Sequence, residues 1–212
     1  MNDIKNKLIW NLHQFFEKGA KRANNEIGTN QMEKNSSYVK ADGGYKCIHL
    51  NPDRFCSIME GVLKNENIAP THTHTLKFLD IGCGVGEKIY LASLFNLNTF
   101  GLELRPQLIE EGKRLLESIG FECGRWETHF GHTHHQNCFI QGDALTYDYK
   151  EFDILYFYCP LMDSQLQEEL EEQIVKTAKS GAIIIPFLAK GICAVGNIPG
   201  WTCKNGQYFV KN

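Results

Sequence analysis

The chain has 212 residues, of which 42% are hydrophobic and 22% are charged, which is enough for one globular domain with its own core. A formal charge of −3 and a pI near 6.2, without a run of clustered Lys and Arg, argue against nucleic acid as a partner. The stretch 1–16 lacks the pattern of a signal peptide, and no run of about 18 apolar residues occurs. We therefore expect a cytoplasmic protein without membrane insertion, and the eight scattered cysteines, none in a Cys-x-x-Cys pair, favour reduced thiols.

Residues 1–70 are predicted to form an N-terminal helical extension with a lid. Apolar residues recur at three- and four-residue spacings over residues 4–19 and again over residues 52–65, which is typical of amphipathic helices. Residues 21–46 between them are polar and rich in Gly and Asn, which indicates a loop or a loosely ordered lid.

From Leu76 onward, short apolar runs alternate with segments of helix length. This alternation is the signature of βαβ units and of a mostly parallel sheet, so residues 71–212 are predicted to form one α/β domain. The predicted strands lie at residues 76–81, 98–104, 138–145, 152–159 and 182–188.

Two of the helices between these strands have recognisable starts. Pro106 suits the first turn of a helix over residues 106–119. Ser164 and Gln167 form a predicted capping box at the start of a helix over residues 164–179, and the glutamates of this helix indicate a solvated face.

The last twelve residues are predicted to form a β-hairpin. Two strand-prone runs in residues 201–212 flank Asn205-Gly206, a dipeptide that adopts the positive φ angles of a type I′ turn. The last strand is therefore expected to run antiparallel to the one before it.

Three glycines, each separated by one residue, stand between the first strand and the next helix in FLDIGCGVGEK. The dinucleotide fingerprint G-x-G-x-x-G is not met, because Glu87 occupies the position of its last glycine, and no Gly-Lys-Ser/Thr follows to form a P-loop. Asp80 on the strand adds a carboxylate to the backbone N–H groups of the turn. This combination suits a ligand that bears both an ammonium and a carboxylate.

The pattern D-x-G-x-G-x-G resembles the first motif of class I S-adenosylmethionine-dependent methyltransferases, and later positions agree with that family in order and spacing. Glu103 ends the second predicted strand, where an acid about 20 residues beyond the glycines accepts from ribose hydroxyls. Asp143 ends the third strand, where the family binds the adenine amino group. The resemblance implies a Rossmann-like, seven-stranded methyltransferase fold with S-adenosylmethionine as cofactor. The implied cofactor-binding residues are Asp80, Gly82, Cys83, Gly84, Gly86, Glu103, Leu104, Asp143, Ala144 and Tyr158.

Two stretches narrow the resemblance within this superfamily. GLELRPQLI, at residues 101–109, and DILYFYCPLMDSQLQEELEEQI, at residues 153–174, are most similar to the lysine N-methyltransferases of the ATP synthase c subunit and elongation factor 1A. The resemblance implies a protein substrate with a lysine acceptor. Two alternatives stay open: a small-molecule or RNA methyltransferase, and a catalytically silent scaffold that binds S-adenosylmethionine.

Transfer of a methyl group to lysine requires the neutral amine, which an apolar or aromatic site favours. Tyr156 and Tyr158 are two residues apart and share one face of the fourth predicted strand, so they are the candidate catalytic residues that line the amine site. Cys159 has no base beside it and is expected to be a buried small hydrophobe. Tyr38 and Lys40, ahead of the domain, are expected to close over the cofactor.

A histidine-rich segment lies between the second long helix of the domain and the third strand. Its side chains are able to bind zinc, but their spacing matches no standard structural site. We therefore expect a polar surface insertion and no metal site. The residues concerned are Cys123, His129, His132, His134, His135 and Cys138.

Overall fold

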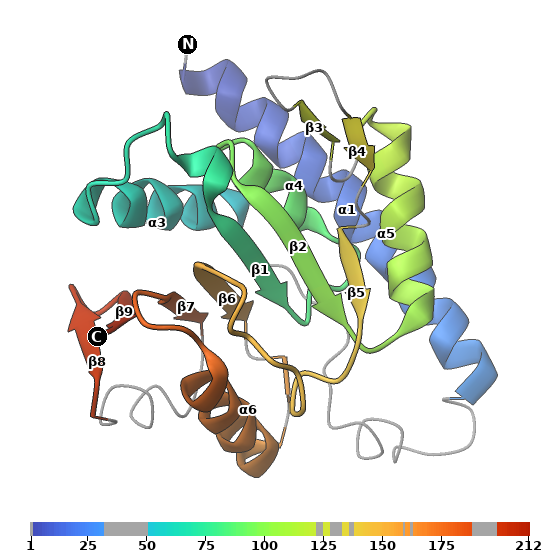
Figure 1. Cartoon of the computed structure of the whole chain (residues 1–212). Coiled ribbons are helices and arrows are strands. Elements are labelled where there is room, and N and C mark those ends of the chain that lie inside the picture. The colour runs from blue at the N-terminus through green and yellow to red at the C-terminus, as the bar shows by residue number, and fades with distance from the viewer. Residues whose placement is uncertain are drawn as a thin grey trace.

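The computed structural model describes residues 2–31, 51–121, 125–127, 133–135, 138–158, 160–161, 163–187 and 199–212. Its centre is a seven-stranded sheet in the order β5-β2-β1-β6-β7-β9-β8 (Figure 1). The strands of this sheet are β1 (Lys77–Ile81), β2 (Asn98–Glu103), β5 (Phe139–Gln141), β6 (Ile154–Tyr158), β7 (Ile183–Phe187), β8 (Trp201–Lys204) and β9 (Tyr208–Lys211).

The order of the strands creates a ligand-binding edge in the middle of the sheet. The five strands from β5 to β7 are parallel, and the chain passes from β1 outward to β2 and β5 before it returns to β6 on the other side of β1. In open α/β sheets, ligands bind outside the carboxyl ends of the strands at such a reversal. A ligand site is therefore expected at the carboxyl ends of β1, β2 and β6.

The C-terminal hairpin completes the sheet as predicted. Strand β9 pairs antiparallel with both β7 and β8, and the turn between β8 and β9 holds Asn205 at φ 53° and Gly206 at φ 66°. Both positive angles are those that a type I′ turn requires. The predicted mostly parallel, seven-stranded fold with an antiparallel end is confirmed.

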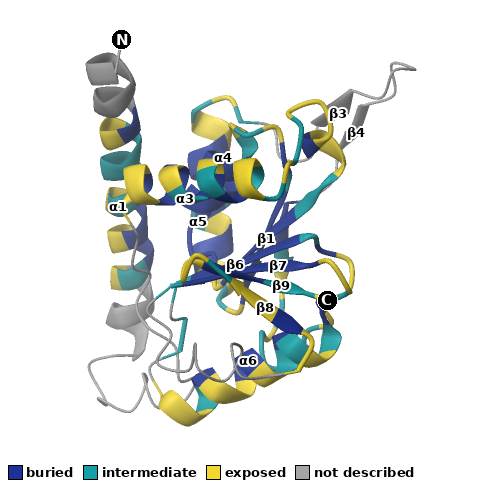
Figure 2. Ribbon diagram, turned by 90° about the vertical axis from the view of Figure 1, so that its left-hand side faces the viewer, coloured by how far each residue is buried: buried dark blue, intermediate teal, exposed yellow. Residues whose placement is uncertain are grey.

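Helices cover both faces of the sheet. They are α1 (Asn2–Gln31), α3 (Pro52–Asn65), α4 (Glu87–Ser93), α5 (Pro106–Ser118) and α6 (Ser164–Thr177), with a short 3-10 turn η1 (Thr73–Thr75). Figure 2 shows α6 on one side of the sheet and α1, α3 and α4 on the other. Two short strands, β3 (Arg125–Glu127) and β4 (Thr133–His135), pair antiparallel in a separate small sheet.

Each face of the sheet has its own hydrophobic core because side chains alternate along each strand. On one face, Leu79 and Leu155 pack with Leu170 and Ile174 of α6. On the other face, Phe78 and its neighbours on β6 and β7 pack with α3 and α4.

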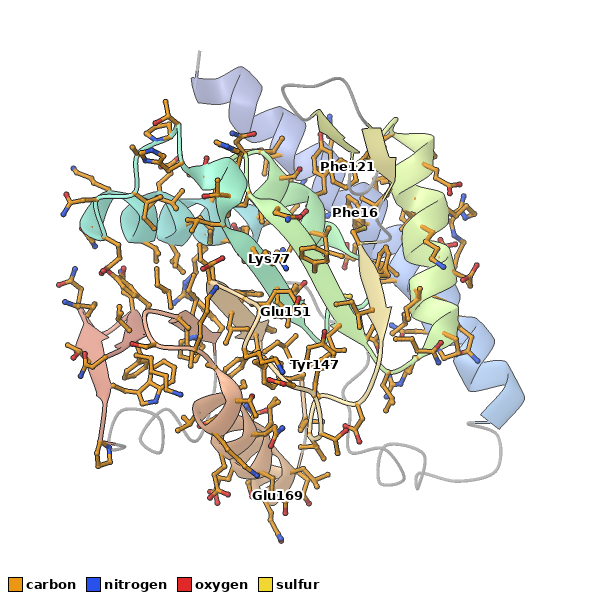
Figure 3. All side chains as sticks on the ribbon, in the orientation of Figure 1. Phe16, Lys77, Phe121, Tyr147, Glu151 and Glu169 are labelled. Atoms are coloured by element: carbon orange, nitrogen blue, oxygen red, sulfur yellow. The ribbon has the colours of Figure 1, made fainter. Side chains whose placement is uncertain are left out.

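The N-terminal helix packs against α4 and α5 rather than against the sheet. Phe16, Ala20 and Ala23 are fully buried in a third cluster with Ile89 and Leu115, and Figure 3 marks the position of Phe16. This stripe continues past residue 19, where the helix was predicted to end, as far as Ala23, and the helix itself ends at Gln31. The loop predicted from residue 21 is thus wrong up to residue 31, and residues 32–50 lie outside the described part of the chain.

Three local expectations need correction. Asp163, not Ser164, caps α6, because its side chain accepts from the N–H groups of Gln165 and Leu166. The glutamates of α6 are mostly exposed, but Glu171 is buried on the inner side of the helix. The expectation of reduced thiols is wrong for Cys138, which is disulfide-bonded.

Among the described residues, no helix is long and apolar enough to cross a membrane.

Two glycines inside helices provide a paired test of this packing. A Cβ atom at Gly112 of α5 would lie 2.9 Å from the Val85 carbonyl oxygen and 2.5 Å from Phe139 Cζ, whereas a Cβ at Gly61 of α3 meets nothing within 4 Å. Ala is favoured over Gly in a helix by about 1 kcal/mol. We expect Gly61→Ala to raise the melting temperature and Gly112→Ala to lower it, measured by thermal unfolding. Equal effects of the two substitutions would contradict the close approach of α5 to the glycine turn.

Candidate active site

The glycine turn at residues 82–86 joins β1 to α4 in a conformation that excludes most side chains. Gly82, Gly84 and Gly86 have φ angles of 76°, 55° and 82°, in the left-handed region that favours glycine. A Cβ atom at Gly82 would lie 2.7 Å from Pro160 Cβ, and one at Gly86 would lie 2.7 Å from Phe139 Cζ. Glycine is therefore required at these positions, where a side chain would meet Pro160 or Phe139, and only Gly82 of the turn is exposed.

The turn is anchored to the end of β2 by its own backbone. The N–H groups of Gly82 and Cys83 both donate to the Leu102 carbonyl oxygen, at 2.8 Å and 3.1 Å. The Cys83 side chain is buried in the cluster that α1 and α5 share, so this residue reaches the site only through its main chain.

Glu103 joins the turn and the end of β2 through its carboxylate. Oε2 accepts from the Gly84 N–H at 2.9 Å, and Oε1 accepts from the Arg105 N–H at 3.0 Å. Burial raises the pKa of the Glu103 carboxyl, while these two N–H groups act in the opposite direction. The carboxylate thus has a defined orientation beside the glycines, at the position predicted for a ribose acid.

The far end of the site is formed by the residues around Glu103 and the loop after β5. Leu104 is one of the few large apolar side chains that are exposed, at 45%. The loop after β5 is bound to the end of β2, because the Gly142 N–H donates to the Glu103 carbonyl oxygen at 3.1 Å. Asp143 is exposed and accepts from the Leu145 N–H, and the Ala144 carbonyl accepts from the Tyr149 hydroxyl. The exposed Leu104 side chain is suited to the flat face of an adenine, and the Asp143 carboxylate is suited to its amino group.

Asp80 lies on the side of the turn toward β6. It is 4% exposed and pairs in register with Tyr156 of β6. The Tyr156 ring packs between α3 and β1, edge-on to Phe55 at 5.1 Å and stacked with Phe78 at 6.3 Å between ring centroids. Burial, and then the nearby charges of Asp80 and Glu87, raise the pKa of Tyr156.

Tyr156 and Tyr158 share a face of β6 but differ in access. Tyr156 is 1% exposed, and its hydroxyl has no hydrogen-bond partner within the described ranges of the chain. Tyr158, at the end of the strand, is half-buried and stacks on Phe187 of β7 with ring centroids 5.8 Å apart. The Arg54 guanidinium of α3 lies 4.5 Å from the centroid of the same Phe187 ring.

Arg54 and Phe187 were missed by the sequence reasoning, and so was His13, which contacts Glu87 from α1. Phe187 belonged to a predicted strand, but nothing in its neighbourhood indicated a site.

The predicted residues of β1, β2, β5 and β6 lie together at one edge of the sheet. Tyr38, Lys40 and Cys159 lie outside the described residues.

The histidine-rich insertion is described only in part. Strand β4 includes His134 and His135, whereas Cys123, His129 and His132 fall outside the described ranges. No group of three or more His, Cys, Asp or Glu side chains able to hold a metal occurs in the described part of the chain. The expectation that the insertion holds no structural metal stays a prediction.

The model of a protein family described as histone methylation protein DOT1 matches residues 53–193, from α3 to beyond β7. The chain belongs to this family. The prediction of a class I S-adenosylmethionine-dependent methyltransferase is thereby confirmed, and S-adenosylmethionine is its cofactor. The positive-φ glycines, the oriented Glu103 carboxylate and the exposed Leu104 side chain fit the methionine, ribose and adenine parts of that molecule.

Solved structures are similar to the DOT1-family chain at low sequence identity. TrmN from Thermus thermophilus is 13% identical, with a TM-score of 0.51 over 72% of this chain and 48% of that chain. An S-adenosylmethionine-dependent methyltransferase from Clostridium acetobutylicum is 14% identical, with a TM-score of 0.48 over 71% and 52%. An RNA methyltransferase from Salinibacter ruber, in complex with S-adenosylhomocysteine, is 16% identical, with a TM-score of 0.47 over 73% and 88%. The chain spans about half the length of the first two.

The predicted ribose contact of Glu103 has a direct test. We expect Glu103→Ala to weaken the binding of S-adenosylhomocysteine by about tenfold to a hundredfold, because hydrogen bonds to a charged group contribute roughly 1.5 to 3 kcal/mol. Isothermal titration calorimetry of the purified chain measures the change. Glu110→Ala, at an exposed glutamate of the neighbouring helix, serves as the control and should bind normally.

The pH dependence of this binding follows from the raised pKa of Glu103. The ribose hydroxyls donate to the ionised carboxylate, so affinity is expected to fall as the pH decreases through a pKa that lies above the ordinary glutamate value. The Glu103→Ala variant should lack this part of the decline. Unchanged affinity in Glu103→Ala at neutral pH would remove Glu103 from the cofactor site.

Proposed function

We propose that the chain transfers methyl groups from S-adenosylmethionine to the side-chain amine of a protein lysine. The observation that carries this proposal is the aromatic corner, which we define as Tyr158, Phe187 and Arg54. Its two rings stack at the carboxyl ends of β6 and β7, and a guanidinium lies over one of them. The corner stands beside β1, whose end begins the glycine turn.

The aromatic corner suits a lysine side chain in two ways. The stacked rings of Tyr158 and Phe187 offer an apolar wall to the methylene stem of a lysine, while the Arg54 guanidinium lies 4.5 Å from the Phe187 centroid. The fixed positive charge of Arg54 also disfavours a second cation nearby, which lowers the pKa of an incoming amine. A lysine bound there would thus lose its proton more readily and become nucleophilic.

S-Adenosylmethionine supplies a methyl group already activated by a positively charged sulfur. The residues of the chain therefore have to align the acceptor and exclude water rather than provide a strong acid or base. Tyr158 is placed to form one wall of the acceptor path, while Tyr156 lies beneath it in the packed interior. The geometry favours Tyr158 as the residue that contacts the acceptor and Tyr156 as its support.

The surface charge of α6 supports a basic protein segment as substrate. This helix follows β6, so its first residues lie near the carboxyl edge of the sheet. Its exposed side chains are strongly acidic, and Figure 3 shows Glu169 directed away from the sheet. Opposite charge on a substrate raises its local concentration. The exposed acids of α6 and its cap are Asp163, Glu168, Glu169 and Glu172.

The family description, histone methylation protein, also names a protein substrate for its members. The narrower similarity to the enzymes of the ATP synthase c subunit and elongation factor 1A stays a prediction. An RNA or small-molecule acceptor, and a silent scaffold, are the alternatives that an experiment has to separate.

Incubation with radiolabelled S-adenosylmethionine tests the proposed acceptor. Core histones, a whole-cell protein extract and total RNA are supplied in parallel, and labelled species are identified by mass spectrometry. Methyl groups on lysine side chains support the proposal. Label confined to RNA or to small metabolites would refute the lysine acceptor, and absence of label with normal cofactor binding would favour the silent scaffold.

The wall formed by Tyr158 predicts a separation of catalysis from cofactor binding. We expect Tyr158→Ala to lower kcat by about tenfold or more while the Kd for S-adenosylhomocysteine changes less than about twofold, because the lost ring contacts the acceptor. Tyr158→Phe keeps the stacked ring and serves as the matched control. A kcat of Tyr158→Ala equal to that of wild type would exclude Tyr158 from the acceptor path.

The charge of Arg54 predicts a shift in the pH–rate profile. If the neutral amine reacts, the rate rises with pH, and removal of the neighbouring positive charge in Arg54→Ala moves this rise to higher pH by up to about one unit. Arg54→Lys retains the charge and should keep the profile near that of wild type. Superimposed profiles of Arg54→Ala and wild type would show that Arg54 does not act on the acceptor amine.

A further inference from the structure

We infer that the N-terminal helix α1 positions the cofactor turn through a buried contact between His13 and Glu87. Glu87 directly follows Gly86 and is the first residue of α4. The family model begins at residue 53, so α1 lies outside the region that it matches. Helix α1 is therefore a part of this chain that the family assignment does not cover.

The Glu87 carboxylate is buried and bound on both oxygens. His13 Nδ1 lies 2.7 Å from Oε1, and the Lys88 ammonium donates to Oε2 at 2.6 Å. The three side chains are only 1% (Glu87), 12% (His13) and 6% (Lys88) exposed. Because an ionised carboxylate only accepts, the His13 ring nitrogen is the donor in this contact.

A buried carboxylate is stable only while its partners remain in place. The contact therefore ties α1 to the first residue after the glycine turn. Lys88 extends the connection to α3, since its ammonium lies 5.6 Å from the centroid of the Phe55 ring. The first turn of α4 is thus held from α1 and, through Lys88, from α3.

The same helix also rests on α5, which flanks the other side of the site. Phe16 packs with Leu115 in a buried cluster. Helix α5 in turn approaches the glycine turn closely, because a Cβ atom at Gly112 would lie 2.9 Å from the Val85 carbonyl oxygen. Helix α1 thus contacts both α4, which begins directly after the glycine turn, and α5, which begins shortly after Glu103.

His13 is a positioning residue in this arrangement, since it acts on the cofactor through Glu87. The full-length variants are compared by calorimetric titration with S-adenosylhomocysteine and by thermal unfolding. We expect His13→Ala to raise the Kd about tenfold, because the turn is then no longer fixed before the ligand binds and has to be ordered on binding. His13→Gln places a neutral N–H donor on the same stem and should restore the Kd to within about threefold of wild type.

Two controls separate positioning from general loss of stability. Arg22→Ala removes an exposed contact between α1 and α5 away from the turn, and Ile174→Val weakens the core on the opposite face of the sheet. Both are expected to retain the wild-type Kd. If His13→Ala proves insoluble, His13→Leu, which keeps the bulk of the side chain, replaces it.

A wild-type Kd in His13→Ala, or an equal rise in Kd in Arg22→Ala and Ile174→Val, would overturn the inference. Amide hydrogen exchange gives a second readout, because residues 84–88 should exchange faster in His13→Ala while β6 remains protected. These measurements use the cofactor product alone. Their outcome is therefore independent of whether the acceptor is a lysine.

Discussion

The geometry of the active site depends on the buried carboxylate of Glu103. It accepts one N–H from the glycine turn and one from the residue after β2, so it joins two segments that are far apart in the chain. Burial alone would favour the uncharged form of this group, and the main-chain donors counteract that preference. The turn can offer the Gly84 N–H because glycine tolerates a φ angle of 55° at this position. The acid and the glycines therefore form one interdependent unit.

A second buried carboxylate, Glu87, stands at the opposite end of the same turn and is stabilised differently. Glu103 is bound by main-chain N–H groups, whereas Glu87 is bound by the side chains of His13 and Lys88. The main-chain donors come from the turn and from Arg105 after β2, so they need no contact with a helix outside the sheet edge. Side-chain donors from α1 make the start of α4 depend on a helix that precedes the family region. The active site thus combines a part fixed by main-chain donors with a part that depends on α1.

Where the sequence reasoning succeeded, the decisive signals were local. The helix at 52–65 has apolar residues at helical spacing, and the last hairpin has Asn205-Gly206 at its turn; both were predicted at the residues where they occur. Where it failed, the signal depended on a distant partner. Helix α1 continues past residue 19 with Ala20 and Ala23 buried in the cluster that it shares with α4 and α5, and small residues of this kind do not mark a helix face by themselves. The burial of Glu171 among exposed glutamates has the same cause.

By itself, the sequence determined the sheet, the glycine turn and the cofactor class, because hydrophobic periodicity, turn chemistry and motif spacing act within short stretches of chain. Only the tertiary structure decided which side chains complete the site. His13 and Glu87 are 74 residues apart, and Arg54 reaches Phe187 from another element of the fold. Contacts of this kind arise when particular faces of helices and strands meet, and they produce no repeating pattern of residues in the sequence of either segment. The cofactor class was therefore readable from the chain, whereas the acceptor wall and the role of α1 followed from packing.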